Sequence, residues 1–186
     1  MIPAVAIAST GLALAYSYLG GPKNNTLVKA SDGRSYKVQE LPDKQEAAEK
    51  MCRIRSKLMK ISEHCREDKS EPYTLLVSRF NPDSIEENDI SADSTSYSEN
   101  KGEKIVICLR DKTQEPFPFV DENTVMFVLI HEMAHLMTNS VGHTPEFWTN
   151  MRCLLHDCIK LGIYHQVNYS KNPVKYCGMT ITDSPL

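Results

Sequence analysis

The sequence lacks several patterns that would assign it to a well-known class. It shows no internal repeat, so it is not a repeat protein, and no Cys-x-x-Cys pair, which argues against a zinc ribbon. A chain of 186 residues does not need disulfides in order to fold. We therefore expect free, mostly buried thiols in a reducing compartment. The cysteines are Cys52, Cys65, Cys108, Cys153, Cys158 and Cys177.

Charged residues are absent from Ile2 to Leu19, where apolar residues dominate. As a helix this stretch would reach about 28 Å, close to the thickness of a bilayer core. Residues 1–22 therefore predict a membrane anchor, inserted through residues 2–19. A cleaved signal peptide competes with it but would need a basic n-region, and an apolar arm in an assembly is a further alternative. Basic residues follow the segment and none precedes it, so we expect the main domain to face the cytosol or a virion interior.

The rest of the chain, residues 27–186, has the size and composition of one globular domain. Apolar residues make up 41% of the sequence and charged residues 24%. Asp and Glu are concentrated in residues 81–103, where apolar residues are too few to form a core. We expect an acidic surface loop there.

Hydrophobic periodicity predicts both helices and strands. Residues 27–30 and 35–38 flank an Asp-Gly pair and predict a hairpin. A helix should begin at Asp43, with one apolar stripe that continues to Cys65. Residues 73–77 and 104–109 are short apolar runs, for which we expect buried strands.

A second stripe on that first helix is basic. It consists of Lys50, Arg53, Lys57 and Lys60. Such a stripe could contact phosphates of nucleic acid or of lipid headgroups. We favour the solvated side of an amphipathic helix, so nucleic acid is a possible but not a favoured partner.

Chemistry is concentrated in residues 124–137, a helix that is apolar nearly all round and that Asp121 or Asn123 can cap. His131 and His135 are four residues apart, so both imidazoles lie on one face of the helix and can reach one ion. Glu132 is turned about 100° from His131 and can act as general base without occupying a ligand position. Ionisable groups in so apolar a helix are costly unless a metal compensates them, and two imidazoles favour zinc.

A third ligand should follow where the chain turns back. Gly142 permits a sharp reversal and His143 follows it directly. Thr144 and Pro145 then provide the cap and first position of another helix, to about Leu161. We favour His143 as the third ligand. The competing donors are Glu146, His156 and His165.

Tyrosines follow the histidines and could hydrogen-bond an oxyanion. The candidates are Tyr164, Tyr169 and Tyr176, of which we select Tyr169. Packing in a small core is the alternative role for each of them.

The segment His131-Glu132-x-x-His135, with Gly142-His143-x-x-x-Phe147-Trp148 after it, resembles the minimal zincin peptidases of the WLM and SprT type. These small proteases include enzymes that act on DNA–protein crosslinks, and large DNA viruses encode WLM-like relatives. The resemblance implies His131, His135 and His143 as zinc ligands and Glu132 as the catalyst. It also implies that the strand at 105–109 is a sheet edge to which an extended substrate could add.

We therefore predict an α+β, zincin-like small domain, with a short mixed sheet, helices and the His-Glu-x-x-His motif on a central buried helix, preceded by an N-terminal apolar helix. The predicted function is zinc-dependent hydrolysis of peptide bonds in a protein or peptide substrate by a membrane-anchored enzyme. The alternative is a catalytically silent membrane- or virion-associated protein that uses zinc to stabilise its fold.

Overall fold

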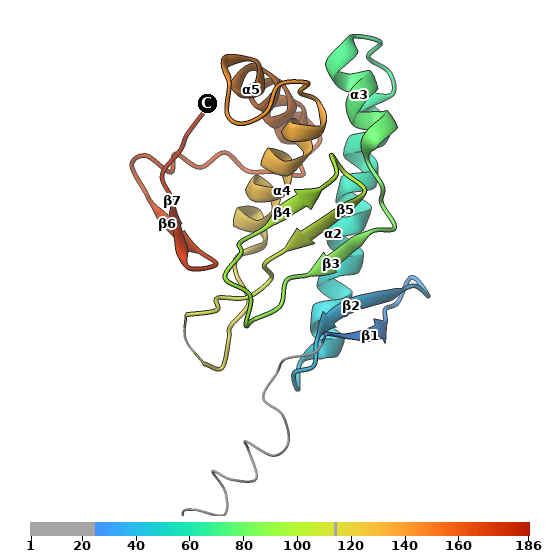
Figure 1. Cartoon of the computed structure of the whole chain (residues 1–186), viewed down its shortest axis with the longest axis vertical. Helices are drawn as coiled ribbons and strands as arrows, with labels where there is room; N and C mark the ends of the chain where they lie inside the picture. The colour runs from blue at the N-terminus through green and yellow to red at the C-terminus, as the bar shows by residue number, and fades with distance from the viewer. Residues whose placement is uncertain (1–24, 114) are drawn as a thin grey trace, which may run out of the picture.

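The computed structural model describes residues 25–113 and 115–186, which form a mixed α+β domain (Figure 1). A five-stranded sheet has the order β1-β2-β3-β5-β4, and β6 and β7 form a separate hairpin. In chain order the elements are β1 (Asn25–Lys29), β2 (Ser35–Gln39), α2 (Lys44–Cys65), α3 (Glu71–Arg79), β3 (Ile85–Glu87), β4 (Tyr97–Glu99), β5 (Lys104–Ile107), α4 (Glu122–Leu136), α5 (Pro145–Lys160), β6 (Val174–Tyr176) and β7 (Met179–Ile181).

The predicted hairpin and first helix are confirmed. β1 and β2 pair antiparallel, and Gly33 in their turn has φ +81°, a conformation that favours glycine. Asp43 precedes α2 as expected, but its side chain does not cap the helix. Its carboxylate instead accepts a hydrogen bond from Arg110. The predicted apolar stripe of α2 is buried in the core.

The strand predicted at residues 73–77 is wrong, because this segment belongs to the helix α3. Ser70 is extended and its carbonyl accepts from the Thr74 amide, and a proline occupies the first turn, as is common at helix starts. Leu76 is the one fully buried residue of α3. A short apolar run in the sequence is equally compatible with a buried strand and with part of a half-buried helix.

The acidic segment 81–103 is not only a surface loop, because it contributes β3 and β4 to the sheet. Its residue Glu87 is buried and accepts hydrogen bonds from the Gln39 amide and from Nε of Arg110, which is also buried. Partners from other elements thus compensate a buried charge. β5 lies between β3 and β4, so the strand at 105–109 is not the sheet edge, and β4 takes that position.

The sheet places its apolar side chains on the helix side. Ile105 and Ile107 of β5 are fully buried, and Figure 1 shows α2 and α4 behind the sheet. The opposite face has ion pairs, including those of Lys37 and Lys104 with Glu86. The core therefore lies between the sheet and the helices, and α4 is its central element.

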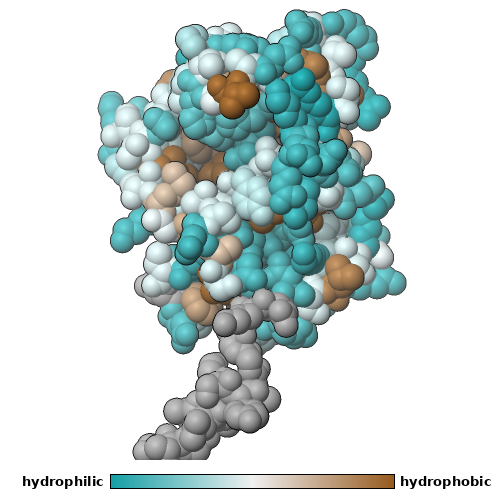
Figure 2. Space-filling model, in the orientation of Figure 1, coloured by the Kyte–Doolittle hydropathy of each residue, from teal (hydrophilic) through white to brown (hydrophobic). Residues whose placement is uncertain are grey.

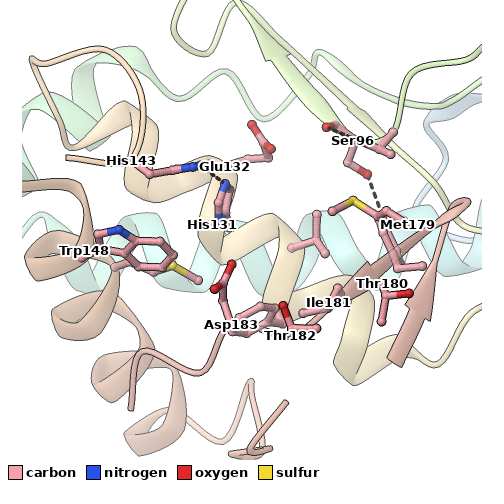
Figure 3. A pocket seen from close by; sticks show the side chains of 15 residues that line it. Ser96, His131, Glu132, His143, Trp148, Met179, Thr180, Ile181, Thr182 and Asp183 are labelled. Atoms are coloured by element: carbon pink, nitrogen blue, oxygen red, sulfur yellow. Dashed lines mark hydrogen bonds between the residues drawn. The ribbon is translucent and has the colours of Figure 1, made fainter. Parts of the chain in front are cut away.

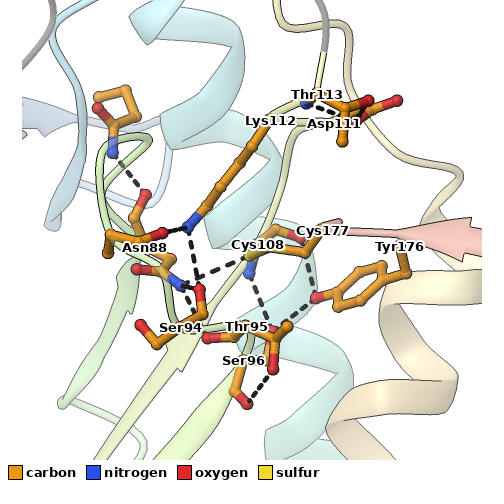
Figure 4. Close-up of a disulfide and its surroundings, with 12 residues drawn as sticks. Asn88, Ser94, Thr95, Ser96, Cys108, Asp111, Lys112, Thr113, Tyr176 and Cys177 are labelled. Carbon is orange, nitrogen blue, oxygen red and sulfur yellow. Dashed lines mark hydrogen bonds between the residues drawn. A yellow bond between two sulfur atoms is a disulfide. The ribbon is translucent and has the colours of Figure 1, made fainter. Parts of the chain in front are cut away.

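The expectation of six free cysteines is wrong for two of them. Cys108, which directly follows β5, forms a disulfide with Cys177, in the turn between β6 and β7 (Figure 4). Three hydrogen bonds reinforce the junction: the Tyr176 hydroxyl bonds the Cys108 carbonyl and the Ser96 hydroxyl, and Ser96 also accepts from the Cys108 amide. The disulfide thus attaches the C-terminal hairpin to the sheet.

The basic stripe of α2 contacts other side chains of this chain. Lys57 and Arg53 pair with Glu122 at the start of α4, and the Lys50 ammonium lies 4.7 Å from the centre of the Phe119 ring. The stripe therefore helps to join α2 to α4. No helix in the described parts of the chain combines the length and apolar character needed to cross a bilayer. The anchor predicted at residues 1–22 lies outside the described residues.

Candidate metal centre

The helix α4 positions the first two histidines and the glutamate. Its N-terminus is fixed by Asp121, whose carboxylate accepts from the Thr124 amide at 2.9 Å. Apolar side chains bury it nearly all round, as the sequence predicts. His131, Glu132 and His135 lie on its C-terminal half, where one side of the helix borders cavities.

His143 joins these histidines from the loop before α5. Gly142, with φ +82°, makes the reversal that the sequence predicts. The Thr144 side chain caps α5 by accepting from the Phe147 amide. The Phe147 ring, buried in the first turn of α5, lies 4.3–4.9 Å from the ring centres of all three histidines. The N-terminus of α5 and the Phe147 ring together fix the positions of the imidazoles.

The three imidazoles direct ring nitrogens towards one point. Nε2 of His131 lies 3.2 Å from Nε2 of His135 and 3.0 Å from Nε2 of His143. A single N–H at Nε2 of His131 cannot donate to both of the other nitrogens at once. Tetrahedral zinc with nitrogen ligands at about 2.0–2.1 Å places those nitrogens about 3.3 Å apart. Two of the three spacings are thus close to those of nitrogen ligands of one metal ion, and all three ligand atoms lie within 4.8 Å of one another.

Burial favours the neutral form of the two histidines of α4. It lowers the pKa of His131 to about 3, and the neighbouring His135 and His143 lower it further as positive charges. Burial and His143 also lower the pKa of His135. Neutral imidazole is the form that coordinates a metal. His131 and His135 therefore both favour the form that binds a metal.

Glu132 lies beside the histidines but outside their cluster. It is 8% exposed, and burial raises its pKa to about 7, with hydrogen bonds from Ser98 acting in the opposite direction. Ser98 belongs to the edge strand β4. Glu132 also lines both cavities that border His131 and His143. Its carboxylate thus faces the space where a substrate would lie.

The competing donors do not join the cluster. Glu146 accepts hydrogen bonds from Ser140 and the Asn139 amide. His156 and His165 are exposed. Over the described residues, no fourth His, Cys, Asp or Glu side chain completes the group formed by His131, His135 and His143.

Tyr169 is not brought to the histidines. It is buried with its ring 4.6 Å from the centre of Phe127, and it lines neither cavity. Tyr176 does line one of them, but its hydroxyl is bonded to Ser96 and Cys108. Of the three tyrosine candidates, the structure therefore brings none to the histidines with a free hydroxyl.

The cavity on the hairpin side of His131 was not predicted from the sequence. It encloses about 260 Å³, and Figure 3 shows residues of β7 and the segment after it along one wall. The disulfide, the hydrogen bonds of Tyr176 and the burial of Ile181 in the core bring this wall to the site. No pattern in the sequence predicts those contacts.

Comparison with known proteins places the chain in a family. Residues 92–182, which contain all three histidines and Glu132, match the WLM domain. The uncharacterized protein R325 of Acanthamoeba polyphaga mimivirus is 32% identical over 82% of this chain and 80% of its own length.

Two shorter similarities involve iridescent viruses. The uncharacterized protein 042R of Invertebrate iridescent virus 3 is 41% identical over 40% of this chain and 45% of its own length. The uncharacterized protein 136R of Invertebrate iridescent virus 6 is 31% identical over 56% and 58%, respectively. No solved structure gives a significant match. The chain belongs to the WLM family, a group of metallopeptidase-like proteins, and its relatives include proteins of large DNA viruses.

Proposed function

We propose that this protein is a zinc-dependent metallopeptidase that hydrolyses peptide bonds of a protein substrate. One observation supports the proposal above the others: three histidines bring ligand nitrogens within 4.8 Å of one another, and a buried carboxylate lies next to them. That combination of ligands and a separate acid–base group is typical of hydrolytic zinc sites.

His131, His135 and His143 would hold the ion. Zinc bound there would polarise the substrate carbonyl and lower the pKa of a water molecule. Glu132 would accept a proton from the attacking water and pass it to the leaving amine, as a general base and then a general acid. Its position on α4, one residue from His131 and facing both cavities, supports this role.

The substrate would extend along β4. This strand ends the sheet, and its Ser98 lies close enough to Glu132 to lower the pKa of that carboxyl. A peptide that added to β4 would gain main-chain hydrogen bonds and carry its scissile bond past Glu132. β4 thus replaces the strand at 105–109 as the proposed docking edge.

A structural zinc site is the competing function. A zinc ion that only stabilises a fold has four protein ligands, whereas a catalytic one keeps a position open. In the part of the chain that the structure describes, three donors converge and no fourth joins them. This count supports catalysis over a structural role.

Glu132→Gln tests the proposal. The zinc-loaded variant should keep its metal but lose cleavage of an unfolded protein substrate, read by mass spectrometry of the new termini. His156→Ala, an exposed histidine outside the cluster, is the control and should cleave normally. Cleavage by Glu132→Gln at a rate comparable to that of the wild type would contradict the proposed role.

The membrane location is a separate proposal. We infer that residues 2–19 anchor the protein and that the domain faces the cytosol or a virion interior, because this uncharged apolar stretch is long enough to cross a bilayer and basic residues follow it. Deletion of residues 1–22 should then move the protein from the membrane to the soluble fraction. Retention in the membrane fraction would contradict the anchor.

A further inference from the structure

The cavity beside His131 has apolar walls. Figure 2 shows apolar surface gathered in a hollow next to the C-terminal hairpin. Phe127 and Val128 of α4 form one wall, Trp148 and Met151 of α5 form another, and β7 closes the third side. His131 and Glu132 border the same space. A side chain of a substrate held at Glu132 would therefore enter this cavity.

One carboxylate lies in this apolar lining. Asp183 follows β7 and is exposed, and Figure 3 shows its carboxylate directed into the cavity. Within the described residues, no lysine, arginine or histidine forms an ion pair with it. Apart from Glu132, Asp183 is the only acid of these residues that lines either cavity next to the histidines. The cavity on the other side of Glu132 has Lys101 instead.

Asp183 shares its cavity with Trp148, whose indole is the best aromatic surface for a cation. A carboxylate and an indole bordering the same apolar space form a site for a positive charge. Lys and Arg side chains place their aliphatic stems along apolar surface and keep the charged head at its polar end. A neutral apolar side chain would fill the walls but leave Asp183 without a partner, and an acidic side chain would be repelled.

We propose that this cavity is the specificity pocket of the protein and takes a substrate lysine or arginine, whose charge is recognised by Asp183. This inference rests on the proposed peptidase function, because it assigns the residue that the site selects next to the scissile bond. Asp183 is here a specificity-determining residue and takes no part in the chemistry.

The test uses sets of three otherwise neutral peptides that differ only at one position, where they carry Lys, norleucine or Glu. In successive sets this position moves along the peptide. Binding is measured by fluorescence anisotropy with the zinc-loaded Glu132→Gln variant, and cleavage with the wild type. At one position, Lys should be favoured over norleucine by about fivefold at low salt, as expected for an exposed ion pair. The preference should weaken as salt is raised.

Two substitutions at Asp183, made in the wild-type and in the Glu132→Gln background, and one control complete the experiment. Asp183→Asn should abolish the preference for Lys, and Asp183→Lys should shift it towards Glu. Glu63→Gln, which changes an exposed acid on α2, should leave it unchanged. A wild type without a preference for Lys, or a preference that survives Asp183→Asn, would overturn the inference.

The proposed function fails separately. If Lys-containing peptides bind in the manner described but the wild type cleaves none of them, the specificity pocket stands and the peptidase proposal is contradicted. If the peptides are cleaved without regard to charge, the peptidase proposal stands and the pocket is contradicted.

Discussion

His143 places its Nε2 atom 3.0 Å from Nε2 of His131, although the two residues belong to different segments. The approach depends on the reversal at Gly142 and on the Phe147 ring beneath both imidazoles. At this distance the two facing nitrogens cannot both carry a proton. The spacing is also close to that of two nitrogen ligands of one metal ion.

Loss of His143 should weaken zinc binding. His143→Ala removes one of three nitrogen ligands, and we expect zinc affinity to fall by more than about a hundredfold, beyond the effect typical of a residue that only supports a ligand. Competition with a chromophoric chelator measures the affinity. His165→Ala, whose backbone and not its ring bonds Asn123, is the control. Equal zinc affinity of His143→Ala and wild type would exclude His143 as a ligand.

Glu132 should make the stability of the metal-free protein depend on pH. Its pKa is raised to about 7 in the folded protein, so between pH about 4.5 and 7 the folded state binds more protons than the unfolded state. The contribution of Glu132 to stability is therefore present below this window and lost as pH rises through it. Relative to wild type, Glu132→Gln should gain stability across the window, by at most about 3 kcal/mol.

Urea unfolding of metal-free wild type and Glu132→Gln at pH 4 and pH 8 measures this difference. His131 contributes its own pH dependence to both proteins, since burial lowers its pKa, and it cancels in the comparison. A difference between the two proteins that is the same at both pH values would show that Glu132 titrates normally.

Gly102 lets the turn between β4 and β5 dock against α4. Its φ is +103°, and a Cβ atom there would lie 2.6 Å from the Arg79 carbonyl oxygen and 2.9 Å from the Leu136 side chain. Gly33 also has a positive φ but has nothing within 4 Å of the same atom. Both substitutions to Ala should cost the strain of a left-handed residue, roughly 1 kcal/mol.

Gly102→Ala should cost more, by about 1–3 kcal/mol, because the backbone contact forces the turn to move. Chemical denaturation of the two variants compares them directly. Similar losses in both would show that the β4–β5 turn shifts without cost. Because β4 holds Ser98 next to Glu132, we also expect Gly102→Ala to reduce cleavage more than Gly33→Ala does.

The disulfide should stabilise the cavity wall. Cys108 and Cys177 are separated by 69 residues, and closing a loop of that length contributes about 4 kcal/mol in the chain-entropy model. Cys177→Ser should lower the free energy of unfolding by up to this amount and speed amide hydrogen exchange in β6 and β7. The control is Cys153→Ser, an exposed free thiol. Unchanged exchange in the hairpin of Cys177→Ser would show that Tyr176 alone holds it.

The sequence predicts a residue's role in this protein when that role depends on neighbours in the chain. The capping of α4 by Asp121 and of α5 by Thr144 follows from local chemistry, and so does the reversal at Gly142. The spacing of His131 and His135 follows from helix geometry alone. These local features already bring together most of the candidate metal centre.

The rest depends on partners that are distant in the sequence. β3 is part of the sheet because Arg110 and the Gln39 amide compensate the charge of the buried Glu87. The acidic composition of residues 81–103 gives no sign of this strand. Pairing of Cys108 with Cys177 spans the domain and has no spacing signature. The cavity and Asp183 depend on that pairing, so they could be recognised only in three dimensions.

In the proposed site three histidines hold zinc and leave one position open. X-ray absorption spectroscopy at the zinc edge of the loaded protein tests it most directly. We predict three imidazole nitrogens at about 2.0–2.1 Å and one further oxygen or nitrogen ligand. Scattering from sulfur at about 2.3 Å, or a fit with fewer than three imidazoles, would contradict the account.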